Sequence, residues 1–285
     1  MQPCPLVQSD AFARTLQALG THARVIRGED PNHPYSCLVQ TRQIPILGSV
    51  HLISRGPVGF GLDVPRIVRS LDLPGVLVVN TPSPHLRPPG FVQVARPKKV
   101  ALLPLNEPHL MRSALHQKWR NALRRAERGA LKVEVTDYSA TGHKWVIERE
   151  LAQQKQGRYR NWPMVFLDTF AQINPGQVKV FEAYRGKQPV AAMVFLCHAP
   201  WVTYHIAVRA ENGDTVGAHT LLLWRAMLAF ADGGYRCLDL GYLSGSAGLV
   251  RFKTRTGAVV QDLGGTWLRF RSASKISPLA RKSAA

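Results

Sequence analysis

Residues 178–209 read VKVFEAYRGKQPVAAMVFLCHAPWVTYHIAVR and contain three runs in which apolar and polar residues alternate. Alternation of this kind predicts strands, and the short connections between the runs predict an antiparallel meander. We therefore expect three strands paired in chain order, over residues 178–185, 190–198 and 201–209.

The segment after the meander begins with a strongly apolar run, Ala218–Asp232, which Gly233 and Gly234 close. This pattern predicts a helix followed by a glycine stop. After this helix we expect a strand over 235–240, a glycine-rich loop over 241–248, a run over 249–256 and a closing strand over 264–271.

The first half of the sequence is of mixed type. Ser9 and Asp10 precede a helical pattern that stops at Gly20. Strands are predicted over 35–43, 49–55, 73–80 and 100–105. A helical stretch over 107–131, a short strand over 132–136 and a second helix over 143–156 lead to the meander. We therefore expect an α/β (α+β) fold with mixed, mainly antiparallel sheets flanked by helices.

The composition is that of a folded protein with a large excess of positive charge. The chain has 285 residues, about two domains' worth, and 45% of them are hydrophobic against 19% charged. Lysine and arginine number 37 and aspartate and glutamate 18, which gives a net charge of +19. An intrinsically disordered chain is excluded by this balance, and an anionic partner is favoured.

Much of the charge gathers in residues 112–132, which carry seven basic residues against one acid, Glu127. Such a helix can bind the phosphate groups of an anionic partner. The residues assigned to this role are Lys118, Arg120, Arg124 and Arg125. The alternative is a generally arginine-rich protein whose cations are only solvated.

Several classes of protein are disfavoured. The longest apolar window, 221–230, is too short to cross a bilayer, and the N-terminus does not resemble a signal peptide. We expect a cytoplasmic protein, with the inner face of the membrane as a further place of association. The four cysteines are scattered and are interpreted as ordinary thiols, and no spacing predicts a metal site.

Three stretches of the sequence carry motifs of a known family. Residues 118–130 (KWRNALRRAERGA) resemble the signature K-x-R-x-x-I-R-K-A-E-K-x-G-V of the FemABX family of aminoacyl transferases. Residues 55–58 (RGPV) are similar to the motif that ends an early strand in that family. Residues 248–257 (GLVRFKTRTG) resemble the G-L-x-x-F-K-x-x-F-G block, and Asp239-Leu240-Gly241 precede them. The chain departs from the pattern at Tyr242 and Thr256.

The resemblance implies tandem domains of the GNAT acyltransferase fold. The implied division is a degenerate first domain over 1–106, a basic helical connection over 107–135, a catalytic second domain over 136–272 and a basic disordered tail over 273–285. The implied reaction moves an aminoacyl group from aminoacyl-tRNA to an amine of a peptidoglycan precursor or similar envelope acceptor, without a further cofactor.

Aminolysis of an ester needs a neutral amine and a donor or cation near the developing oxyanion, and it needs no covalent nucleophile. Lys253 matches the lysine of the family block and is assigned the charge-stabilising role. Asp239 ends a strand beside a glycine, where it can hold an amine or orient Lys253, or simply cap a loop. Tyr204 and Tyr242 are candidate hydrogen-bond donors, or ordinary buried tyrosines.

Phe252 and Arg251 complete the expected substrate-binding residues, although core packing explains Phe252 equally well. Residues 209–218 lack the spacing of a loop that binds the pyrophosphate of CoA, which favours a donor other than CoA. Two alternatives stay open: an N-acyltransferase that uses acyl-CoA or acyl carrier protein on a sugar, amino acid or lipid amine, and a non-catalytic protein that binds RNA or an anionic membrane surface.

Overall fold

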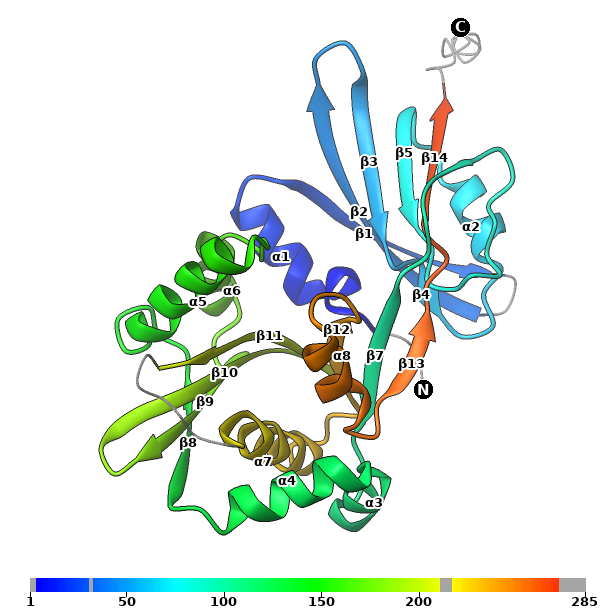
Figure 1. The fold of residues 1–285 in the computed structure, drawn as a ribbon. Coiled ribbons are helices and arrows are strands. Elements are labelled where there is room, and N and C mark those ends of the chain that lie inside the picture. Colours follow the sequence, from blue (N-terminus) through cyan, green and yellow to red (C-terminus); the bar gives the residue numbers. More distant parts are fainter. Residues whose placement is uncertain (1–3, 31–32, 211–216, 272–285) are drawn as a thin grey trace, which may run out of the picture.

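The computed structural model describes residues 4–30, 33–210 and 217–271, which form two seven-stranded sheets (Figure 1). The first sheet contains strands from the N-terminal part of the chain together with the last strand. Its order is β1 (His22–Asp30), β2 (His33–Ile44), β3 (Gly48–Ser54), β5 (Gly75–Asn80), β14 (Thr266–Arg271) and β6 (Val92–Ala95), with β4 (Val58–Gly59) paired to β2.

The second sheet is built around the predicted meander. Its order is β13 (Val259–Asp262), β7 (Lys99–Pro104), β12 (Cys237–Tyr242), β11 (Trp201–Arg209), β10 (Gln188–His198), β9 (Val178–Arg185) and β8 (Leu131–Asp137). Strands β9, β10 and β11 pair antiparallel in chain order, so the prediction is confirmed. The pairing of β11 with β12 is parallel.

The two sheets exchange strands, so that each contains a strand that lies far in sequence from the strands it pairs with. Strand β14, near the C-terminus, pairs with β5 and β6 in the first sheet. Strand β7, from the first half, pairs with β12 and β13 in the second sheet. The domain boundaries at residues 106 and 272 stay a prediction, and the strand exchange ties the two halves together across them.

Helices cover both faces of the second sheet, and helices also pack against both faces of the first (Figure 1). On one face of the second sheet lie α3 (Pro108–Ala114), α4 (Gln117–Glu127), α7 (Ala218–Asp232) and α8 (Ala247–Thr254). The opposite face packs against η1 (Leu6–Gln8), α1 (Asp10–Ala18), α5 (Lys144–Gly157) and α6 (Met164–Ile173). The first sheet packs against α2 (Val64–Ser70).

The sequence explains where these helices begin and which face they bury. The Ser9 hydroxyl accepts a hydrogen bond from the Phe12 amide at 3.1 Å and so caps α1. In α4 the apolar side chains Trp119, Leu123 and Ala126 are buried against the core. The spacing of these three residues, at i, i+4 and i+7, puts them on one helix face.

Strands β1, β6 and β13 and helices α2 and α6 were not predicted from the sequence. The three strands lie at the edges of their sheets, where side chains bury little and the apolar–polar alternation is weak. Among the described helices, none has both the length and the apolar character that crossing a bilayer requires. The predicted tail, 273–285, lies outside the described residues.

Candidate active site

The candidate site forms where β11 and β12 diverge. The two strands pair only from Trp201 to Thr203 and from Cys237 to Asp239, although β11 continues to Arg209. The sheet therefore opens directly after Thr203. Tyr204 is the first residue of β11 beyond the paired segment, and Asp239 is the last paired residue of β12, so their positions border the same opening.

Asp239 is fixed by two hydrogen bonds. Its Oδ2 atom accepts a 2.6 Å bond from Nη1 of Arg55, and its Oδ1 atom accepts a 2.8 Å bond from the backbone amide of Gly241. The Asp239 side chain is only 2% exposed and that of Arg55 13%. Arg55 follows β3, so this buried ion pair connects the first sheet to the opening in the second.

Lys253, on α8, is a second cation beside this opening. Its residue is 7% exposed, and its Nζ atom donates a 3.0 Å hydrogen bond to the carbonyl of Tyr242. Burial lowers the pKa of Lys253 to about 8, against the opposing effect of the Asp239 carboxylate. The amine is therefore mostly protonated at neutral pH but can lose its proton at mildly alkaline pH.

Tyr204 lies beside Lys253, whose Nζ atom is 5.6 Å from the centre of the phenol ring. This distance allows a cation–π contact. Burial and the nearby Glu150 carboxylate raise the pKa of Tyr204, so the phenol stays protonated and able to donate. The structure thus brings together Lys253, Asp239 and Tyr204, three of the residues named from the sequence, and their roles stay a prediction.

Glu150 is a feature of the site that the sequence analysis missed. It is 2% exposed and accepts hydrogen bonds from the Tyr159 hydroxyl at 3.0 Å and from Asn161 Nδ2 at 3.3 Å. Its hydrogen-bond partners lie at the end of α5 and in the loop that follows. No sequence motif in this stretch predicts these contacts. Arg55 was missed as a site residue too, although its RGPV motif was visible.

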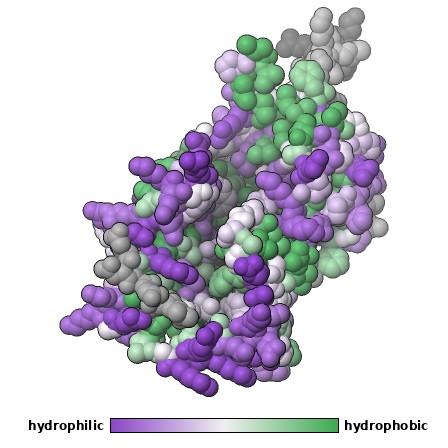
Figure 2. Space-filling model, in the orientation of Figure 1, coloured by the Kyte–Doolittle hydropathy of each residue, from purple (hydrophilic) through white to green (hydrophobic). Residues whose placement is uncertain are grey.

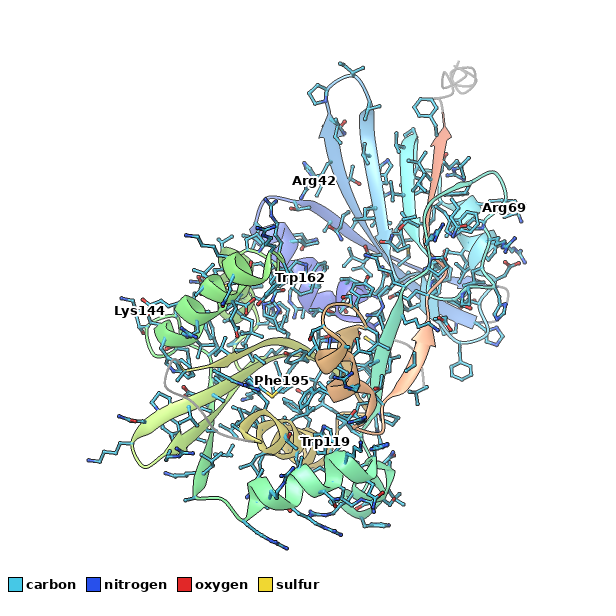
Figure 3. The ribbon with its side chains drawn as sticks, viewed as in Figure 1. Arg42, Arg69, Trp119, Lys144, Trp162 and Phe195 are labelled. Carbon is cyan, nitrogen blue, oxygen red and sulfur yellow. The ribbon has the colours of Figure 1, made fainter. Side chains whose placement is uncertain are left out.

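The other predicted binding residues are placed differently from the group around Lys253. Tyr242 contributes its backbone carbonyl, while its partly exposed ring lies 5.2 Å from Nζ of Lys98. The Phe252 ring centre lies 6.2 Å from that of Trp119, so Phe252 anchors α8 to α4. Arg251 is exposed. Figure 3 shows Trp119 on α4.

The cations of α4 do not converge on Lys253. Lys118, Arg124 and Arg125 are exposed, and their charges face solvent. Arg120 is partly buried, and its Nη2 atom donates 2.9 Å hydrogen bonds to the carbonyls of Ser113 and Leu115. Arg120 therefore holds the end of α3, which is a structural contact.

The thiol and imidazole groups near the opening are poorly suited to covalent catalysis. Burial raises the pKa of the Cys237 thiol to about 12, so it carries no thiolate at neutral pH. Burial lowers the pKa of His198 to about 4, and its Nε2 atom lies 2.8 Å from the Thr203 hydroxyl. The loop considered for CoA, 209–218, lies largely outside the described residues.

The surface is hollowed between the part of the molecule built on the first sheet and the part built on the second, as Figure 2 shows. The Arg55–Asp239 pair joins these two parts.

Comparison with known proteins defines the class of the fold. Residues 113–254 match the family model described as an acetyltransferase (GNAT) domain. This span is just under half of the chain and includes Tyr204, Asp239 and Lys253 of the candidate site, while Arg55 lies outside it. A comparison with curated protein sequences gives no match.

Solved structures show the same fold over nearly the whole chain. FemX has a TM-score of 0.73 at 11% identity, covering 93% of this chain and 92% of that one. L-PGS from Bacillus licheniformis has a TM-score of 0.56 at 14% identity, covering 95% and 92%. The C-terminal domain of a putative lysylphosphatidylglycerol synthetase from Agrobacterium fabrum has 0.55 at 17%, covering 92% and 88%. The expected GNAT-like fold is confirmed.

Proposed function

We propose that this protein transfers an aminoacyl group from aminoacyl-tRNA to an amine of a peptidoglycan precursor or a similar envelope acceptor. The observation that carries the proposal is the convergence of Lys253, Tyr204 and the Arg55–Asp239 pair where β11 and β12 diverge. A buried cation and a protonated phenol beside one opening are suited to an oxyanion.

The reaction requires no covalent intermediate on the protein. The acceptor amine attacks the ester carbonyl, a C–N bond forms, and the bond between that carbonyl carbon and the ribose oxygen breaks. The proton lost by the amine ends on the ribose oxygen, so that an ester and an amine give an amide and an alcohol. Positioning of the two substrates and stabilisation of the oxyanion supply the rate enhancement.

Lys253 is assigned the stabilisation of this oxyanion. Its Nζ atom donates one hydrogen bond to the Tyr242 carbonyl, which fixes the position of the amine. Its other N–H groups can donate to the oxyanion. Tyr204 is assigned the role of a second hydrogen-bond donor, either to the same oxygen or to the substrate. Asp239 holds the Gly241 amide, and its negative charge raises the pKa of Lys253 against the effect of burial.

Support for an aminoacyl donor comes from the sequence motifs and from the names of similar structures. The 248–257 block resembles that of the FemABX family and contains Lys253. FemX and a putative lysylphosphatidylglycerol synthetase share the fold, and the second name contains an aminoacyl group, lysyl. Acyl-CoA stays the alternative donor.

The experiment offers both donors separately to the purified full-length protein. Bulk charged tRNA or acetyl-CoA is incubated with a mixture of peptidoglycan precursors, and the products are read by mass spectrometry. The proposal predicts a mass increase of one amino-acid residue with charged tRNA. An acetyl increment with acetyl-CoA alone would overturn the donor assignment, and no increment with either donor would favour a binding function.

A further inference from the structure

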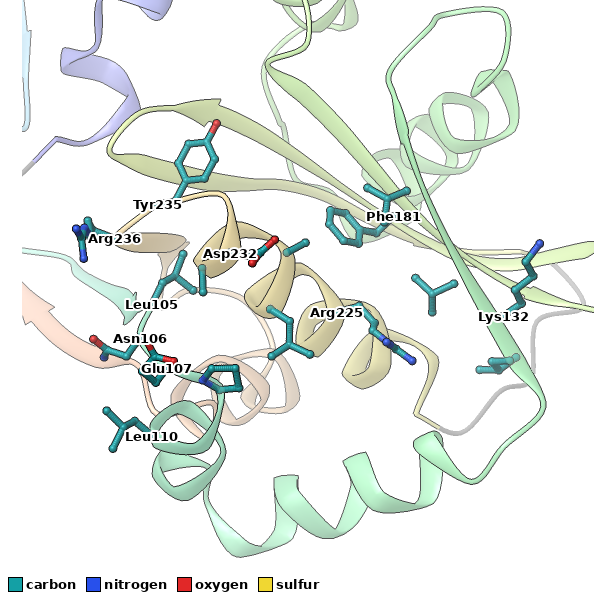
Figure 4. Close-up of a pocket in the computed structure, with 18 residues that line it drawn as sticks. Leu105, Asn106, Glu107, Leu110, Lys132, Phe181, Arg225, Asp232, Tyr235 and Arg236 are labelled. Carbon is teal, nitrogen blue, oxygen red and sulfur yellow. The ribbon is translucent and has the colours of Figure 1, made fainter.

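A second cavity, of about 1260 Å³, lies on the α7 side of the second sheet (Figure 4). Its walls are the outer face of α7, the edge strand β8 and the start of α3. It shares no residue with the group around Lys253. Its function is therefore a question separate from the transfer reaction.

About half of the surface that lines this groove is apolar, and the carboxylates of Glu107 and Asp232 line it as well. Phe181 lies at its base, and Leu228 of α7 lines it from one side. Leu110 and Val135 also line it and are about half exposed, 50% and 48%. Exposed apolar side chains that line one concave surface are typical of a binding site for an apolar group.

Cations border the groove. Arg225 of α7 lines it, and α4 runs along its edge in Figure 4. On α4 and directly after it, Arg124, Arg125 and Arg128 are exposed, and within the described residues no carboxylate lies at ion-pair distance from them. The cations nearby that do have partners are Arg112, paired with Glu127 at 2.7 Å, and Lys132, paired with Glu134 at 2.7 Å.

We propose that the groove and the exposed face of α4 together dock on a lipid bilayer that contains anionic phospholipid. An acyl chain lies along the apolar side chains of the groove, and lipid phosphates lie against Arg124, Arg125 and Arg128. Apolar burial and attraction of cations to anionic headgroups are the two contributions by which proteins bind a membrane surface. The arginines on α4 are thereby assigned to lipid phosphates.

Other occupants fit the groove less well. A second copy of the chain would bring two proteins of net charge +19 together at a cationic surface, which repulsion opposes. A nucleic acid would neutralise the arginines but leave Leu110 and Val135 exposed to water. A phospholipid offers phosphates to the α4 cations and an acyl chain to the apolar part of the lining.

The test is flotation of the full-length protein with vesicles of pure phosphatidylcholine or of phosphatidylcholine with 30% phosphatidylglycerol. Binding to the anionic vesicles is expected. The triple variant Arg124→Gln, Arg125→Gln, Arg128→Gln should lower the partition coefficient at least tenfold, since each cation near an anionic surface contributes roughly a fivefold effect. No donor or acceptor is added, so the result is independent of the proposed transfer activity.

A matched control removes the same charge elsewhere. Arg24, Arg42 and Arg69 are exposed on the part of the molecule built on the first sheet, where Figure 3 labels the last two. Their triple change to glutamine should lower binding less than threefold. An equal loss in the two triple variants would overturn the proposed surface, because binding would then follow net charge alone.

The apolar part of the proposal has its own variant, Leu110→Asp with Val135→Asp. Both side chains are exposed, so folding should be retained and can be checked by circular dichroism. Vesicle binding should fall and should not be restored by lowering the salt concentration. Unchanged binding would overturn insertion of an acyl chain. Loss of tRNA binding, with vesicle binding intact, in the α4 triple variant would assign this surface to nucleic acid instead.

Discussion

The Nη1 atom of Arg55 donates a 2.6 Å hydrogen bond to Oδ2 of Asp239, across 184 positions of sequence. Both side chains are nearly removed from water. This pair connects the end of β3 in the first sheet to the end of the paired segment of β12 in the second. It therefore couples the relative position of the two sheets to the geometry around Lys253.

Breaking this pair on one side should strongly destabilise the fold. Arg55→Met leaves the Asp239 carboxylate buried without its cation, and the expected loss in unfolding free energy is about 3–5 kcal/mol. Adding Asp239→Asn removes the buried charge and retains an acceptor for the Gly241 amide. The double variant should be more stable than Arg55→Met alone in urea unfolding, and additive losses would contradict this account.

The pH dependence of the rate should report the protonation of Lys253. A lysine that stabilises an oxyanion must be protonated, and its lowered pKa of about 8 places the loss of that proton just above neutral pH. The rate constant kcat should therefore fall as the pH rises through about 8. The acceptor amine acts in the opposite direction, because it must be neutral to attack.

Lys253→Arg separates these two effects, because the guanidinium stays charged over the whole range. The variant should be slower than the wild type but should lack the descending limb near pH 8. A descending limb that persists at the same pH in the arginine variant would assign it to another group.

Tyr204→Phe tests the donor role of the phenol. The substitution keeps the ring beside Lys253 and removes only the hydroxyl, so thermal stability should change little. Loss of one oxyanion donor lowers kcat by about 10²–10³-fold in well-studied cases. We expect at least a tenfold decrease in kcat, measured by steady-state kinetics beside the melting temperature. A wild-type kcat would show that Tyr204 only packs.

Gly257, at the end of the block that contains Lys253, should resist substitution for a reason of packing. It has φ of +88°, and a Cβ atom there would lie 2.9 Å from Ala114 Cβ and 3.2 Å from the Ala114 carbonyl oxygen. Gly234 has φ of +78° with no atom within 4 Å of such a Cβ, so Gly234→Ala is the matched control. Both changes carry the backbone cost of about 1–2 kcal/mol.

Gly257→Ala should lose on the order of 1 kcal/mol more than Gly234→Ala in urea unfolding, because α3 must shift to accept the new methyl group. Equal losses for the two variants would show that α3 moves aside freely.

The sequence predicted the meander from the alternation in its runs and from the short connections between them. Strand β10 is nonetheless buried on both faces from Val190 to His198, so its sequence is a nearly continuous apolar run. The helix α7 was predicted from its continuous apolar run, and Lys253 from the motif that surrounds it. These signals are local, so a single sequence contains them.

The remaining features depend on contacts between distant parts of the chain. The pairing of β14 with β5 and the ion pair of Arg55 with Asp239 have no local signal. Glu150 looks like a surface residue of a charged helix in the sequence, and only the fold buries it against Tyr159 and Asn161. The α4 cations were assigned to substrate from composition, although their exposure places them on the outer surface.

The most direct test of the central claim is the initial rate of amide formation from charged tRNA by the wild-type protein and by Lys253→Met. Stability of the variant is checked by its melting temperature, since removal of a buried amine should not unfold the chain. The account predicts aminoacyl transfer by the wild type and a decrease of about 10²–10³-fold in the variant. Equal rates in the two proteins would contradict the role of Lys253 at this site.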